Sequence, residues 1–156
     1  MRGTALKSIS NGMLFSEVRR LIGEGRQVTL LSKGYSMLPF IVGGRDSVLL
    51  EPCRDVAVYD ILLCEISPGR YVIHRLVGID GGTLTLMGDG NLMATEHCSR
   101  ADVVAKVVGI VRPDGRNIDC CSASERRKAR LWLRLLPLRR FLLALWRRTH
   151  RSLLQD

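Results

Sequence analysis

The chain has 156 residues, enough for one domain to bury a hydrophobic core without the help of disulfides or a structural metal. The odd number of cysteines, five, argues against a disulfide framework and favours reduced thiols in the cytoplasm. The net charge of +9 is concentrated near the end of the sequence, because residues 122–156 hold ten basic side chains and only two acidic ones.

Residues 1–25 are expected to form an N-terminal helical segment. They contain no apolar stretch of the kind that secretory signal peptides have. The run from Ser16 to Ile22 mixes apolar and charged residues at helical spacing, which predicts a short amphipathic helix that ends near Gly23. No helix-turn-helix pattern precedes the first predicted strand, which argues against a DNA-binding repressor.

Six segments between residues 26 and 112 have the composition of β-strands. They are Val28–Leu31, Ser47–Glu51, Ile61–Ile66, Tyr71–Ile79, Thr83–Met87 and Val103–Val111. Turn-forming sequences, Ser67-Pro68-Gly69 and Asp80-Gly81-Gly82, separate neighbouring segments, so these are expected to pair as hairpins. Short strands joined by such turns predict a mainly β fold, either an antiparallel sheet or a partly closed barrel.

The stretch Gly34-Tyr35-Ser36-Met37-Leu38-Pro39 is predicted to form an exposed turn that presents a serine hydroxyl. Gly34 permits a positive φ and Pro39 fixes its own φ, so both residues favour a turn. A serine hydroxyl becomes an effective nucleophile only when a base removes its proton. The candidate base is His74, inside an apolar run, and the candidate carboxylate is Asp89, inside a glycine-rich turn.

Four motifs, in this order, resemble those of the S24/S26 serine peptidases, which include the signal peptidases and the LexA-type self-cleaving repressors. The motifs are Ser36-Met37-Leu38-Pro39, Asp60-Ile61-Leu62-Leu63, Val72-Ile73-His74-Arg75-Leu76-Val77 and Gly88-Asp89-Gly90-Asn91. Bacterial signal peptidases and LexA-type members have a lysine where this chain has His74. A histidine there is similar to the endoplasmic-reticulum and archaeal signal peptidases. The resemblance implies a LexA/signal peptidase-like, coiled β-barrel-like domain over residues 26–112, with a short N-terminal helix and a C-terminal amphipathic helix on either side.

The resemblance also implies a role for each candidate. Ser36 would attack a peptide carbonyl, and His74 would take its proton as general base and then donate it to the leaving amine. Asp89 would accept a hydrogen bond from the other ring nitrogen or brace the loop that holds the histidine. The backbone N–H of Ser36 would help to bind the oxyanion. Gly34 departs from the nearest signal peptidases, which often carry a serine there as a donor to the oxyanion, and the N-terminal membrane anchor of those enzymes is not seen.

Each candidate also has a purely structural interpretation. Ser36 could cap a backbone N–H in its turn, His74 could be a satisfied core histidine, and Asp89 could be an ordinary turn residue. Asp46 and Asp60 match acidic positions of the family, but neither follows the usual glycine, so both are predicted to be turn residues. No cofactor or metal is predicted, because no pair of cysteines has the spacing of a zinc site.

Residues 113–122 are polar and are expected to be a linker, followed by a helical tail over residues 123–156 that is interrupted near Pro137. One face of the tail collects residues at helical spacing: Leu138, Phe141, Leu142, Leu145, Trp146, Thr149 and Leu153. The flanks and the opposite face carry arginines: Arg139, Arg140, Arg147, Arg148 and Arg151. No apolar run approaches the roughly 20 residues that a membrane-spanning helix needs.

A basic amphipathic helix of this kind is typical of peripheral binding to an anionic membrane. The residues expected to contact the membrane are Leu138, Phe141, Leu142, Leu145 and Trp146, with flanking Arg139, Arg140, Arg147 and Arg148. Packing on the body or on a partner is the second interpretation. Nucleic-acid binding is the third, because the apolar face is too rich for an arm that works through charge.

These features together predict a serine endopeptidase of the signal peptidase type, with Ser36 as nucleophile and His74 as general base. It would cleave a dedicated leader or a membrane-proximal peptide in the cytoplasm or at the cytoplasmic face of the membrane. The alternative is a non-catalytic peptide-binding or membrane-docking module on the same fold. The distance between Ser36 and His74 distinguishes the two, since only the peptidase needs them within hydrogen-bond reach.

Overall fold

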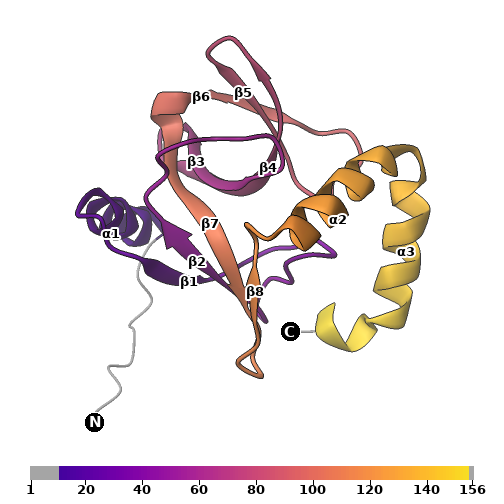
Figure 1. Ribbon diagram of the computed structural model, residues 1–156. Coiled ribbons are helices and arrows are strands. Elements are labelled where there is room, and N and C mark those ends of the chain that lie inside the picture. The colour runs from indigo at the N-terminus through magenta and orange to yellow at the C-terminus, as the bar shows by residue number, and fades with distance from the viewer. Residues whose placement is uncertain (1–10, 155–156) are drawn as a thin grey trace.

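The computed structural model describes residues 11–154. Eight strands form one antiparallel sheet, preceded by helix α1 (Asn11–Gly23) and followed by α2 (Ala123–Arg134) and α3 (Arg139–Thr149) (Figure 1). The strands are β1 (Val28–Leu31), β2 (Ser47–Glu51), β3 (Ile61–Ser67), β4 (Arg70–Asp80), β5 (Thr83–Met87), β6 (Glu96–Ser99), β7 (Val103–Val111) and β8 (Asn117–Asp119). Three short 3-10 helices are η1 (Arg100–Asp102), η2 (Leu136–Leu138) and η3 (Arg151–Leu154). The mainly β class, with helices before and after the strands, is therefore confirmed.

The strands follow the order β1-β2-β7-β3-β4-β5-β6, and β8 pairs with the end of β7. The ends of this path, β1 and β6, are not paired with each other within residues 11–154, so the sheet is open. Register shifts interrupt the pairings of β2 with β7, of β3 with both of its neighbours, and of β4 with β5. Such irregularities increase the local twist of a sheet, and the strands curl accordingly in Figure 1.

The main hydrophobic core lies between α1 and the sheet. Val18 and Ile22 are buried on α1, one helical turn apart, and pack with Val48, Leu63 and Val107 of β2, β3 and β7. The remaining face of α1 is charged and exposed, which fits the predicted amphipathic helix. Residues 1–10 of the predicted N-terminal segment lie outside the described residues.

All six predicted strands are present, with ends within one residue of the predicted ones. Two short strands, β6 and β8, were not predicted from the sequence. β8 lies inside residues 113–122, which were expected to be a linker, and it hydrogen-bonds to β7 through the pairs Gly109↔Asp119, Ile110↔Ile118 and Val111↔Asn117. The linker prediction was therefore wrong, because this segment folds back as a hairpin onto the end of β7.

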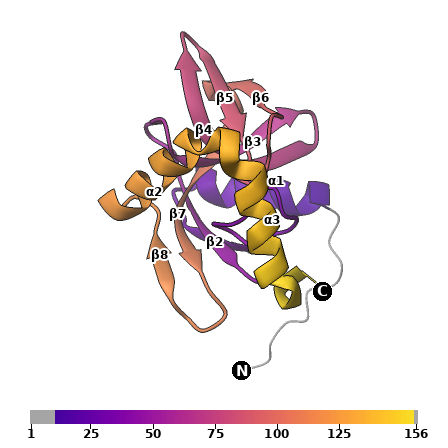
Figure 2. The same cartoon turned by 90° about the vertical axis from the view of Figure 1, so that its right-hand side faces the viewer.

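The C-terminal helices pack on the body, on the side opposite to α1 (Figures 1 and 2). Helix α2 begins at the N-cap Ser122, whose hydroxyl accepts from the Glu125 N–H, and Pro137 lies in η2 where the tail was expected to be interrupted. Leu143 of α3 is buried against Leu38 and Val42 of the turn that follows β1. None of the helices within residues 11–154 combines the length and apolar character that crossing a bilayer requires.

This packing divides the apolar face that was predicted to contact a membrane. Trp146 and Leu153 lie against the buried cluster around Leu143, and Leu142 is half-buried. Arg139, expected on the flank of the helix, is completely buried. Trp146 and Arg139, both expected to contact the membrane, are therefore engaged with the body while the helices stay packed, which corrects that part of the prediction.

Candidate active site

Ser36 lies in a turn-rich segment between β1 and β2, where apolar side chains hold the backbone in place. Met37 and Ile41 are buried in the main core, whereas Leu38 and Val42 are buried against α3. The residues next to Ser36 thus anchor the turn to both layers of the molecule. The Ser36 side chain itself stays partly exposed.

Hydrogen bonds close the base of this turn. Ser32 donates from its N–H (2.9 Å) and its hydroxyl (2.7 Å) to the Asp46 carbonyl, and the Gly44 N–H donates to the Ser32 carbonyl at 2.8 Å. Gly34 has a φ of +73°, as its place in the predicted turn requires, and this conformation is unfavourable for other residues. The position of Ser36 is therefore set by a closed loop rather than by a free chain.

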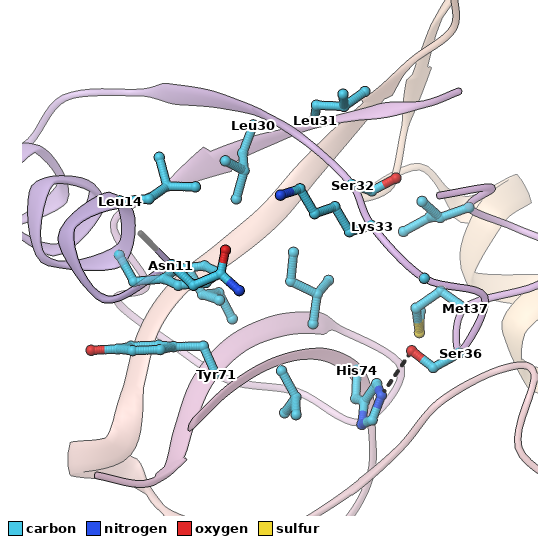
Figure 3. Close-up of a pocket in the computed structure, with 16 residues that line it drawn as sticks. Asn11, Leu14, Leu30, Leu31, Ser32, Lys33, Ser36, Met37, Tyr71 and His74 are labelled. Atoms are coloured by element: carbon cyan, nitrogen blue, oxygen red, sulfur yellow. Dashed lines mark hydrogen bonds between the residues drawn. The ribbon is translucent and has the colours of Figure 1, made fainter. Parts of the chain in front are cut away.

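His74 comes from β4, where it pairs with Leu62 of β3, and only 5 % of its surface is exposed. Its Nε2 atom lies 3.1 Å from the Oγ atom of Ser36, within hydrogen-bond distance. Figure 3 shows the two side chains facing each other across this bond at one end of a pocket. The structure thus brings together the two residues, 38 positions apart in sequence, that the sequence analysis had paired.

The other ring nitrogen of His74, Nδ1, lies 2.7 Å from Oε2 of Glu96, at the start of β6. Strand pairing brings Glu96 close to the histidine. Leu76, two residues after His74 on β4, pairs with Leu86 of β5, and Leu86 in turn pairs with Glu96 of β6. A carboxylate only accepts hydrogen bonds, so Nδ1 donates and Nε2 keeps the lone pair that can accept the Ser36 proton. Glu96 was not predicted from the sequence, since it lies in neither a motif nor a predicted strand.

Asp89 was predicted to bond to His74 or to brace the histidine loop, and the first of these is wrong. Its carboxylate accepts two hydrogen bonds from Arg75, 2.8 Å from Nε and 2.7 Å from an Nη atom, and both residues are buried. Arg75 also donates to the Tyr59 carbonyl at 2.9 Å. Because Arg75 follows His74 on β4, the pair links the Asp89 loop to the strand that carries the histidine.

The Asp89 loop also supports the serine directly. The Gly90 N–H donates to the Ser36 carbonyl at 2.8 Å. A Cβ atom on Gly90 would lie 2.6 Å from the Tyr35 carbonyl oxygen, which is closer than two such atoms can approach. Position 90 therefore has to be glycine for the loop to approach the serine turn this closely.

Asp46 and Asp60, predicted as turn residues, are buried ion-pair centres. Asp46 accepts from the Val42 N–H at 2.8 Å and from Arg45 and Arg112. Asp60 pairs with Lys106 at 2.9 Å and with Arg126 of α2 at 2.8 Å. Tyr59, which precedes Asp60, has a φ of +82°, so a tyrosine occupies the left-handed conformation that a glycine adopts more easily.

A pocket of about 260 Å³ extends from Ser36 and His74 towards α1 (Figure 3). Its walls are mostly apolar and come from α1, β1, the serine turn and β4, including Phe15, Leu30, Met37, Ile73 and Tyr71. Phe15 stacks on Tyr71 with ring centres 4.4 Å apart, which closes the far end. This volume is smaller than a typical drug-sized ligand site, and it suits one or two apolar side chains.

The Ser36 N–H has no hydrogen-bond acceptor among the described residues. It is therefore free to donate to a bound acceptor. With Gly34 two positions earlier, no side-chain donor is available at that place.

Most of the cysteines are buried or partly buried, and only Cys121 is exposed. All five are free thiols, and burial raises the pKa of Cys64 and Cys98, and that of Cys120 to about 12. A metal binds the thiolate, so such protonated thiols are poor ligands. Within residues 11–154, no three His, Cys, Asp or Glu side chains gather closely enough to hold a metal ion.

The candidate site is thus a buried histidine between a partly exposed serine hydroxyl and a carboxylate, beside an apolar pocket. Chemically, such an arrangement can transfer a proton away from the serine as its oxygen attacks a carbonyl carbon. Comparison of the sequence with protein-family models gave no match, and comparison with curated proteins gave none either.

Proposed function

We propose that the protein is a serine endopeptidase with a signal peptidase-like, coiled β-barrel-like fold, in which Ser36 is the nucleophile and His74 the general base. The observation that carries this proposal is the chain of contacts from the Ser36 hydroxyl through His74 to Glu96, 3.1 Å and 2.7 Å long. The same constellation of hydroxyl, imidazole and carboxylate recurs in hydrolases of unrelated folds and is identified by its geometry.

The reaction follows from this geometry. Oγ of Ser36 bonds to the carbonyl carbon of the scissile peptide while its proton passes to Nε2 of His74, and the carbonyl oxygen becomes an oxyanion that the Ser36 N–H stabilises. The C–N bond then breaks as His74 gives the proton to the leaving amine. Water next attacks the acyl-serine ester and loses a proton to His74. The C–Oγ bond then breaks, the acid is released, and His74 returns the proton to Oγ of Ser36.

A peptide is the substrate class that the surroundings of the site favour. The outer edge of β1 has no strand partner within the described part of the chain, and neither does the edge of Arg70–Ile73 in β4 that faces away from β3. Both edges border the pocket. An extended peptide can hydrogen-bond to such free edges while an apolar side chain enters the pocket. The substrate proposed is an extended segment such as a leader or a membrane-proximal peptide.

The proposal is tested by labelling with a fluorophosphonate probe and by mass spectrometry of a mixture of synthetic peptides. We expect Ser36→Ala and His74→Gln each to abolish labelling and cleavage, whereas Ser124→Ala, at an exposed serine of α2, leaves both unchanged. Circular dichroism verifies that each variant is folded. Labelling of the Ser36→Ala protein at the normal rate, or its normal cleavage of peptides, would show that the nucleophile is another residue.

The non-catalytic alternative, a peptide-binding or membrane-docking module, predicted that Ser36 and His74 lie too far apart for a hydrogen bond. The distance of 3.1 Å does not favour it. A folded wild-type protein that takes up no probe and cleaves no peptide would restore that alternative.

A further inference from the structure

The outward surface of the C-terminal helices carries large apolar side chains that nothing covers within the described residues. Leu131 of α2, Leu138 of η2, and Phe141 and Leu145 of α3 are between 53 % and 61 % exposed. Figure 2 looks onto α3, which lies in front of the sheet. We call these four side chains, together with the arginines described next, the helical platform.

Helix geometry separates the platform from the packed face of α3. Leu143 and Trp146 pack on the body, and at 100° per residue Phe141 and Leu145 project away from them. The four apolar side chains of the platform do not line the pocket beside Ser36. They also do not line a second pocket, which lies around Arg45 and Arg112. They stand on the surface rather than inside a groove, so they suit a broad partner surface better than an inserted side chain.

Positive charge surrounds these apolar side chains. Seven exposed arginines of the two helices and η3 make no ion pair with a carboxylate among the described residues: Arg127, Arg130, Arg134, Arg140, Arg147, Arg148 and Arg151. Glu125, the only acidic residue between positions 123 and 154, pairs with Lys128 at 2.5 Å. The platform therefore carries a net positive charge that the acidic residues of its own helices do not neutralise.

We propose that the helical platform binds the surface of an anionic lipid bilayer, with Phe141 and Leu145 entering the interface and the arginines contacting lipid phosphates. Exposed leucine and phenylalanine side chains among unpaired arginines match such an interface on both counts, apolar area and charge. A nucleic acid would use the arginines but would leave the apolar side chains without a role. The inference concerns helices that are not part of the proposed catalytic site, so it does not depend on peptidase activity.

The test is co-sedimentation of the full chain with vesicles of phosphatidylcholine alone or mixed with phosphatidylglycerol. We expect binding to the mixed vesicles only, and weaker binding at high salt. Arg147→Gln/Arg148→Gln should lower the partition coefficient about thirtyfold, since each arginine contributes on the order of a fivefold effect. Arg26→Gln/Arg54→Gln, which removes the same charge from exposed sites elsewhere, is the matched control and should have little effect.

Phe141→Ser/Leu145→Ser tests the apolar part and should also release the protein from the mixed vesicles. Its matched control is Ile79→Ser, at an exposed apolar position of β4. Failure of the wild-type protein to sediment, or equal binding by the platform variants and their controls, would overturn the proposal. So would tight binding of short duplex DNA or RNA that survives in the Phe141→Ser/Leu145→Ser protein, because the arginines would then serve nucleic acid.

Discussion

At the residue scale, Glu96 is the group whose role the structure adds to the serine and histidine. Its carboxylate accepts from Nδ1 of His74 and therefore leaves Nε2 free to accept the Ser36 proton. A side-chain amide in its place can donate to Nδ1, which would move the ring proton to Nε2 and block the base. In the proposed peptidase, Glu96 would thus act as a positioning residue, through the histidine.

We expect Glu96→Gln to reduce the limiting rate of phosphonylation by a fluorophosphonate probe by about 10²- to 10⁴-fold, since a wrong histidine tautomer disables the base. Binding of the probe before reaction should change little, so the loss should fall on kinact and not on KI. Glu96→Asp should recover part of the rate. Arg70→Gln, which removes an exposed ion pair of 3.7 Å with Glu96, is the control and should react almost normally.

If Glu96→Gln instead weakened probe binding and left the limiting rate intact, Glu96 would be a substrate-binding group. A normal rate and normal binding would show that the contact with His74 is incidental.

The sequence contained the information for Ser36 and His74 but not for Glu96. Glycine and proline mark the serine turn, and a histidine among apolar residues of a strand is conspicuous. Glu96 begins a four-residue strand whose neighbours, Thr95 and His97, are as polar as itself. Only the pairing of β5 with β6 brings it to the histidine, and a long-range pairing of this kind leaves no local signal.

At the element scale, the loop Gly88–Asn91 and strand β4 hold each other through the pair of Asp89 with Arg75. Both side chains are buried, so removing the carboxylate leaves a guanidinium without a counter-charge. The same loop donates the Gly90 N–H to the Ser36 carbonyl. Stability and the position of Ser36 therefore depend on one element.

Asp89→Ala should lower the free energy of unfolding by about 3–5 kcal/mol, as measured by urea denaturation, because it leaves Arg75 buried and unpaired. Asp114→Ala, which removes an exposed partner of Arg116, should change the stability little. A loss for Asp89→Ala as small as that of the control would mean that Arg75 reaches water and that the pair is not a structural centre.

The long strands were predictable and the two short ones were not, for a physical reason. β3, β4 and β7 have seven to eleven residues with many β-branched side chains and clear turns at their ends. β6 and β8 have four and three residues and few apolar ones, so their conformation comes from hydrogen bonds to a neighbour that is already in place. Their composition alone is that of a loop.

At the scale of the whole molecule, the C-terminal helices are part of the same folded unit as the sheet. Nε1 of Trp132 donates to the Asp89 carbonyl at 2.8 Å, and Arg139 donates to the Asn91 carbonyl at 2.9 Å. Both carbonyls belong to the loop that supports Ser36. Burial lowers the pKa of Arg139, which has no carboxylate partner within the described residues and lies 5.2 Å from the centre of the Trp132 ring.

The sequence could predict that the tail is amphipathic but not what its apolar face contacts. An apolar stripe has the same spacing whether it packs on a protein or on a bilayer. The surface that receives Leu143 consists of Leu38 and Val42, which belong to the serine turn, more than one hundred residues earlier in the sequence. Only the fold reveals that one part of the stripe packs on the body while Phe141 and Leu145 stay exposed.

Two leucines on α3 test this division directly. Leu143 is 3 % exposed and Leu145 is 61 % exposed, although they are two positions apart on one helix. Leu143→Ala should lower the free energy of unfolding by about 2–5 kcal/mol, because it leaves a cavity against Leu38 and Val42. Leu145→Ala should cost a few tenths of a kcal/mol at most, since its side chain already lies in solvent.

Urea denaturation monitored by tryptophan fluorescence and by circular dichroism should give one coincident transition for both proteins if the chain unfolds as one unit. Trp132 lies on α2 and reports the C-terminal helices, whereas circular dichroism also reports the sheet and α1. A separate early transition in fluorescence would mean that the helices detach before the sheet unfolds. In that case the supports of the Asp89 loop from Trp132 and Arg139 would be lost first, and catalysis by Ser36 would fail at urea concentrations that leave the sheet intact. A single transition, with the large loss confined to Leu143→Ala, is what a helical layer packed on the serine turn requires.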